Sequence, residues 1–204
     1  MTYFRNIALI HENSCECAKS ELDLFFVPPT QTSIESGMYV EYHPISSLTS
    51  GAPIEFDVSS SGDDYMDLTN SLLHVRVKIT KSDGSNIAAN ETVGPINNFL
   101  HSLFSQVDVT LNGTLITSST NTYAYRAYLE TLLSYGPAAK RSQLTAALFY
   151  KDEAGKMDKP NPRANDAADK NSGLGTRADF SAESKEIDLI GRIDSNMLFQ
   201  ENTC

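Results

Sequence analysis

Histidines, cysteines and clustered acids are the side chains of this chain that could do chemistry, and their spacing matches no familiar site. The four histidines stand at positions 11, 43, 74 and 101, and none has the i, i+4 partner of an HExxH zinc motif. Cys15 and Cys17 are separated by a single residue, which is too close for a zinc knuckle, and Cys204 has no neighbouring cysteine. We therefore expect no metal and no cofactor.

Acidic and nucleophilic motifs lead to the same expectation. Asp63, Asp64 and Asp67 follow a Ser/Gly run, but they lack the spacing and terminal Glu of an EF-hand, so a turn is the better interpretation. The sequence contains no GxSxG, Walker loop or GxGxxG. His74 and Asp108 fall on the polar sides of alternating segments, where ordinary exposed residues are expected. We predict that the chain is not an enzyme and has no catalytic residue.

Charge and hydropathy exclude further classes. The 204 residues carry a formal net charge of −10 with a sequence pI near 4.8, which argues against direct binding to nucleic-acid phosphates. No run approaches the roughly 20 apolar residues of a membrane span. The N-terminus is a poor signal peptide, and the three cysteines are an odd number, so an intracellular rather than secreted protein is expected.

The elements that would position any site centre on residues 93–135. Apolar residues at helical spacing predict a short helix within 97–104, and Val107, Val109 and Leu111 then alternate with polar residues as in a strand. Asn112-Gly113 is the dipeptide that favours a type I′ hairpin turn, and residues 114–117 would form the partner strand. A second helix is expected over 123–135, ended by Gly136-Pro137.

The flanking regions alternate with the period of strands. The expected strands are 38–43, 54–58, 65–68, 72–80, 185–193 and 196–199, with another helix over 141–151 and a long polar loop over 152–178. Many short strands separated by turns, without a βαβ pattern, predict an all-β fold: an antiparallel β-sandwich of jelly-roll type with two or three short helices in the loops.

The predicted organisation is an N-terminal arm over residues 1–30, followed by one jelly-roll domain over 31–204. Apolar residues of the arm would be costly to expose, and the tyrosines near the 123–135 helix suit a contact between subunits. The predicted interface residues are Leu22, Leu24, Phe25, Phe26, Tyr123, Tyr125, Tyr128 and Tyr135.

Several runs resemble one family. SELDLFFVPPTQTSIESG, VEYHPISS, PIEFDVSSSGDDYMDL, VGPINNFLHSLFSQVDVTLNG, STNTYAYRAYLETLLSYG and QLTAALFYKD are similar, in this order, to the jelly-roll capsid proteins of Polinton (Maverick) elements and adintovirus-like viruses, which also persist as virus-derived copies in animal genomes. The resemblance covers most of residues 19–200.

The resemblance implies a structural virion protein that assembles with copies of itself, as a trimer or larger, and with other capsid proteins. LFSQVDVTLNG resembles the double jelly-roll major (hexon-type) capsid proteins; the minor (penton-type) single jelly roll is the alternative. Proteins of this family continue into a second set of strands, so we expect a truncated or domesticated copy, or a separate single-domain product. A β-sandwich binding a glycan or a host protein is the competing class.

Overall fold

The computed structural model describes residues 36–48, 52–59, 62, 65–117 and 120–194. They belong to two compact units, residues 1–67 with 201–204 and residues 68–200. The expected arm, the 196–199 strand and all three cysteines lie outside the described residues.

The described part of the first unit contains no regular helix or strand. Its segments 38–48 and 52–59 are joined by a hydrogen bond from Ile45 N to Glu55 O (2.8 Å) and by two bonds of the Ser46 hydroxyl, from Glu55 N (2.9 Å) and to Pro53 O (3.0 Å). The strands predicted over 38–43 and 54–58 are therefore wrong. Their apolar residues alternate but remain exposed, so alternation brings no buried face to stabilise a strand.

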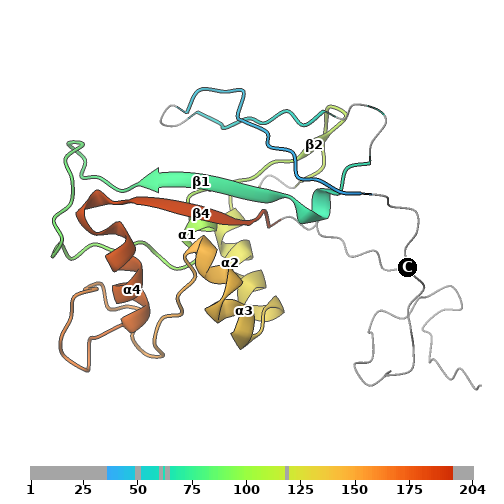
Figure 1. Cartoon of the computed structure of the whole chain (residues 1–204). Coiled ribbons are helices and arrows are strands. Elements are labelled where there is room, and N and C mark those ends of the chain that lie inside the picture. The colour runs from blue at the N-terminus through green and yellow to red at the C-terminus, as the bar shows by residue number, and fades with distance from the viewer. Residues whose placement is uncertain (1–35, 49–51, 60–61, 63–64, 118–119, 195–204) are drawn as a thin grey trace, which may run out of the picture. The chain divides into compact units, whose positions relative to one another are not determined.

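The second unit is built on an antiparallel ribbon of two strands, β1 (Leu72–Lys78) and β4 (Glu186–Arg192), which run side by side in Figure 1. Val75 lies opposite Leu189 and Val77 opposite Ile187. Since side chains alternate between the faces of a strand, one face of the ribbon is apolar and the other is charged. Both strands lie within the ranges that the sequence predicts.

Helices lie on the apolar side of this ribbon, and some of them contact β4 directly. They are α1 (Phe99–Ser102), α2 (Tyr123–Ser134), α3 (Pro137–Arg141) and α4 (Ser172–Ser181), which gather on one side of the strands in Figure 1. Three short 3-10 helices are also present among the described residues: η1 (Leu68–Asn70), η2 (Gln143–Ala147) and η3 (Ala182–Ser184). The core consists of residues from α1, the η2 segment and the ribbon: Leu100, Ala147, Leu148, Ile187 and Leu189.

Close packing at Gly191 shows how tightly α1 meets the ribbon. Gly191 lies opposite Leu73, and a Cβ placed on it would lie 2.8 Å from Cδ2 of Leu100. Leu100 is completely buried, so its side chain has no free space into which to retreat. The glycine of β4 thus allows the first helix to approach the strand.

A small hairpin of β2 (Thr110–Leu111) and β3 (Thr114–Leu115) follows α1. Asn112 and Gly113 have φ values of 50° and 77°, so both central residues of the turn are left-handed, as a type I′ turn requires. A bond from Ile116 N to Val109 O (2.9 Å) extends the pairing by one step. The predicted turn is confirmed.

The all-β sandwich is wrong for the part of the chain that the structure describes. The fold is mixed, with four α-helices, three 3-10 helices and two small two-stranded sheets among the described residues. A sandwich needs a second sheet over the apolar face of the first, but here α1, η2 and α4 contact β4. The jelly roll predicted from the strand count is therefore not the observed architecture.

Two further predictions fail locally. The helix expected over 141–151 is replaced by α3 and the 3-10 helix η2, and Leu148 ends η2 in the left-handed region at φ 58°. Residues 65–67 are not a strand and lead directly into η1. In contrast, α2 covers all but the last residue of the helix predicted over 123–135.

Candidate functional site

Of the predicted interface residues, the four in the arm, Leu22, Leu24, Phe25 and Phe26, lie outside the described residues. The four tyrosines do not share one exposed face. Tyr123 is buried and Tyr125 is 77% exposed. Tyr128 is half-buried with its ring 6.4 Å from that of Phe149, and Tyr135 is half-buried after the end of α2.

Tyr123 points inward and links α1 to the end of β4. Its hydroxyl lies 2.9 Å from Nδ1 of His101 and accepts a hydrogen bond from the backbone N–H of Asp194 (3.3 Å). The hydroxyl can donate to an unprotonated Nδ1 of His101 or accept from a protonated one, and in either tautomer it can also accept from Asp194. Burial lowers the pKa of His101 to about 4 and raises the pKa of Tyr123 to about 12, so both are neutral near pH 7.

Asp194 is the second titratable group at this end of α2. Burial, and then a hydrogen bond with Glu130 and its negative charge, raise the pKa of Asp194 to about 7, while Arg126 opposes the shift. Arg126 also donates from Nη2 to the Asp194 carbonyl (3.1 Å), and its Nε lies 3.8 Å from Oε1 of Glu130. These contacts bind the end of β4 to the first turns of α2.

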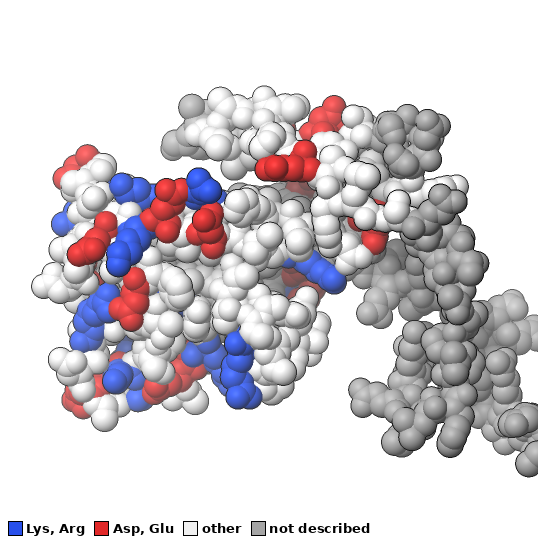
Figure 2. Space-filling model, viewed as in Figure 1, with Lys and Arg blue, Asp and Glu red and all other residues white. Residues whose placement is uncertain are grey.

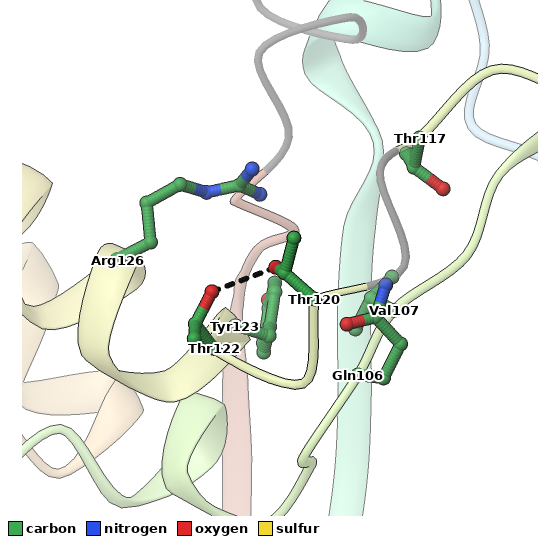
Figure 3. Close-up of a pocket in the computed structure, with 7 residues that line it drawn as sticks. All are labelled: Gln106, Val107, Thr117, Thr120, Thr122, Tyr123 and Arg126. Atoms are coloured by element: carbon green, nitrogen blue, oxygen red, sulfur yellow. Dashed lines mark hydrogen bonds between the residues drawn. The ribbon is translucent and has the colours of Figure 1, made fainter.

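A hollow beside these groups is too small for a ligand. Figure 3 shows the side chains that line it, with Arg126 on one side and Val107 on the other, and the Thr120 and Thr122 hydroxyls 2.7 Å apart. Its volume of about 10 Å³ is roughly the space of one water molecule. We assign it no substrate.

Arg177 is the most enclosed charge among the described residues and has a structural role. It is 2% exposed and donates to the carbonyls of Pro95 (2.9 Å) and Tyr150 and to Oδ1 of Asp152 (2.8 Å). Asn171, which caps α4, donates to the same carboxylate oxygen at 2.8 Å. This network orders part of the segment expected to be a long polar loop over 152–178, and α4 begins inside that segment.

The outer face of the ribbon is charged and solvated, as expected for His74. His74 Nε2 lies 3.2 Å from Oδ1 of Asp188, and Arg76 Nε lies 3.2 Å from the same oxygen and 3.0 Å from Oε1 of Glu186. All four side chains are more than half exposed, so these pairs contribute little to stability. Figure 2 shows blue and red side chains gathered on the surface over the strands, whereas the surface over α2 is largely white.

The outward face of α2 was only partly predicted from the sequence, which gives Tyr125 as an interface residue but not Leu129 or Leu133. Tyr125, Leu129 and Leu133 follow each other at intervals of four and are 77%, 56% and 86% exposed. The sequence carries the signal, because Tyr125, Leu129 and Leu133 are spaced four residues apart and therefore lie along one side of a helix. An outward face of this kind on a surface helix is typical of a docking surface.

The described residues contain no group of three or more His, Cys, Asp or Glu side chains placed to hold a metal ion. None of the helices in the same residues has the length and apolar content needed to cross a bilayer.

The chain is similar to an uncharacterized protein of Caenorhabditis elegans, F54H12.2. The two are 30% identical over 137 residues, which are 63% of this chain and 33% of that protein. The chain thus spans about a third of the length of the curated relative it matches. No family model and no solved structure matches the chain.

Proposed function

We propose that this chain is a structural subunit of a virion shell, related to the capsid proteins of Polinton (Maverick) elements and adintovirus-like viruses. It acts by assembling with copies of itself and with other shell proteins, and it carries out no reaction. The resemblance of LFSQVDVTLNG to the major capsid proteins of that group favours the major, hexon-type role over the penton-type one.

The observation that carries an assembly function is the incomplete sheet of the second unit. Within the described residues, β1 pairs only with β4, and neither strand makes a backbone hydrogen bond to another described segment along its outer edge. A two-stranded ribbon is marginally stable alone, and open edges accept additional strands. Association that adds a strand from a neighbouring subunit would pair such edges.

Exposed apolar side chains support the same function. Among the described residues, apolar side chains of β1, β2, β3 and β4 are roughly half exposed: Leu72 48%, Leu111 56%, Leu115 49% and Ile190 42%. Contacts with neighbouring subunits would remove them from water, and a shell repeats one such interface many times, so each contact can be weak.

The test is the state of the purified full chain across about a hundredfold range of concentration. Light scattering and negative-stain electron microscopy should show trimers or larger particles that grow with concentration. Hydrogen exchange of the amides in residues 72–78 and 186–192 should slow on assembly, because their open edges become paired. A stable monomer at every concentration would contradict the proposal, and a monomer that binds a glycan array would favour a binding protein.

A further inference from the structure

The outward face of α2 has a composition that suits a second copy of the same helix. Tyr125, Leu129 and Leu133 lie within a narrow sector, since residues four apart are neighbours along one side of an α-helix. The opposite side, with Tyr123, Ala127 and Thr131, is buried against the same unit. The stripe is therefore an additional apolar surface rather than the margin of the core.

The charges of α2 are also arranged for self-pairing. Arg126 and Glu130 are its charged residues and lie on one flank of the stripe. Within one copy Arg126 Nε is 3.8 Å from Glu130 Oε1, and the two side chains remain 39% and 41% exposed, so the pair can also meet charges of a partner. In an antiparallel helix pair related by a two-fold axis, equivalent flanks face each other with their direction reversed. With the axis near Leu129, Arg126 and the partner's Glu130 then lie about 3 Å apart along the helix direction, from the rise of 1.5 Å per residue.

We propose that the outward face of α2 binds the α2 of a second copy in an antiparallel, two-fold contact centred on Leu129. In this contact Leu129 meets its own copy, Tyr125 meets the partner's Leu133, and the Arg126–Glu130 pair that is already formed within each copy extends to the same pair of the partner. The proposal rests on the proposed function insofar as both require copies of the chain to associate, and it adds the surface and the symmetry.

The size of the contact sets its strength. A standard stable interface buries about 800 Å² on each partner, and one helix with three exposed apolar side chains offers less. The α2 contact is therefore weak and depends on concentration, as suits a shell in which each interface is repeated. Its two-fold symmetry distinguishes it from contacts that build trimers, so it joins one oligomer to the next.

Cysteine crosslinking tests the geometry in the full chain with Cys15, Cys17 and Cys204 changed to Ser. In Leu129→Cys the two cysteines face each other across helix axes about 8–10 Å apart, which brings their Cα atoms within disulfide range, so oxidation should give a covalent dimer. In Leu133→Cys the two copies of the residue lie about 12 Å apart along the helices and should not crosslink. A mixture of Tyr125→Cys and Leu133→Cys proteins should crosslink to each other.

Lysine substitutions test the apolar stripe. Leu129→Lys and Leu133→Lys should weaken dimerisation about tenfold or more in sedimentation equilibrium, because each buries a charge in the contact. Both positions are exposed in the single copy, so the melting temperature of the dilute protein should not change. Ser134→Lys is the matched control, since Ser134 is exposed on α2 but lies outside the stripe, and it should leave dimerisation unchanged.

The outcomes separate the two proposals. Oligomers that persist unchanged in Leu129→Lys, together with no covalent dimer in Leu129→Cys, would overturn the α2 contact and leave the shell function standing. A monomer at every concentration would overturn both. If Leu129→Lys instead lowered the melting temperature of a monomer by several degrees, residues of the same chain would cover the stripe, and the α2 contact would again be refuted.

Discussion

The Tyr123 hydroxyl contacts the His101 ring and the backbone N–H of Asp194, and the side chains of these two residues respond to pH in opposite ways. His101 has a pKa lowered to about 4, so its contribution to stability is fully present above its usual value of 6.5 and is lost as the pH falls toward 4. Asp194 has a pKa raised to about 7, so its contribution is present at low pH and is lost as the pH rises through 7. Between pH 4 and 6.5 the two effects partly cancel.

Substituting one residue at a time should reveal how the other makes the free energy of unfolding depend on pH. Asp194→Asn removes the opposing carboxyl group and keeps the histidine, so the free energy of unfolding should fall more steeply than in the parent as the pH falls from 6.5 to 4. His101→Asn should instead give a protein whose stability rises, relative to the parent, as the pH falls from 7. Urea unfolding across this pH range measures both. Identical pH profiles for the parent and Asp194→Asn would exclude a raised Asp194 pKa.

Arg177 anchors the segment between η2 and α4 through groups that have little access to water. Arg177→Met should destabilise the protein by about 3–5 kcal/mol, because it leaves the Asp152 carboxylate buried without its partner. Arg141→Met is the control: Arg141 is exposed and bonds to the Pro137 carbonyl of its own helix, so the expected change is within about 0.5 kcal/mol. Urea unfolding measures the loss of stability in both variants. Equal losses in Arg177→Met and Arg141→Met would mean that the buried network does not stabilise the fold.

At the scale of elements, the turn between β2 and β3 depends on one glycine. Gly113→Val should destabilise the hairpin by about 1–2 kcal/mol or more, because a β-branched residue is strained at φ 77°. Steric overlap with neighbouring residues does not cause this destabilisation, since a Cβ at Gly113 would have no atom within 4 Å. Gly136→Ala is a suitable control, with the same open space but without a positive φ. Thermal unfolding measures the difference, and a Gly113→Val protein as stable as the parent would contradict the strained turn.

At the scale of the whole molecule, the described sheet and the α2 stripe both expose apolar side chains that association would bury. Anything that binds only the folded state raises its apparent stability, and a self-associating protein supplies its own ligand. The melting temperature should therefore rise over about a hundredfold increase in protein concentration. The Leu129→Lys variant should show a smaller rise than the parent. A melting temperature independent of concentration would rule out assembly as a source of stability.

The local elements follow from the sequence where one short-range cause decides them. Asn112-Gly113 specifies its turn because few other dipeptides tolerate two left-handed residues. Gly136-Pro137 ends α2 and starts α3, since proline suits the first position of a helix. The alternation in β1 and β4 identifies the face that the structure buries, including Val75 and Leu189. Each of these signals concerns residues close together in the chain.

Tertiary structure alone decided which alternating segments became strands and what covered them. Residues 38–43 alternate as β1 does, yet β1 finds β4 more than a hundred residues later, whereas the earlier segment finds no strand partner among the described residues. Periodicity shows that one face is apolar, but it does not show whether a sheet or a helix will cover that face. In this fold helical segments, and not a second sheet, pack against the ribbon of β1 and β4. Tyr125, Leu129 and Leu133 remain exposed, because burial depends on what packs against a residue and not on its type alone.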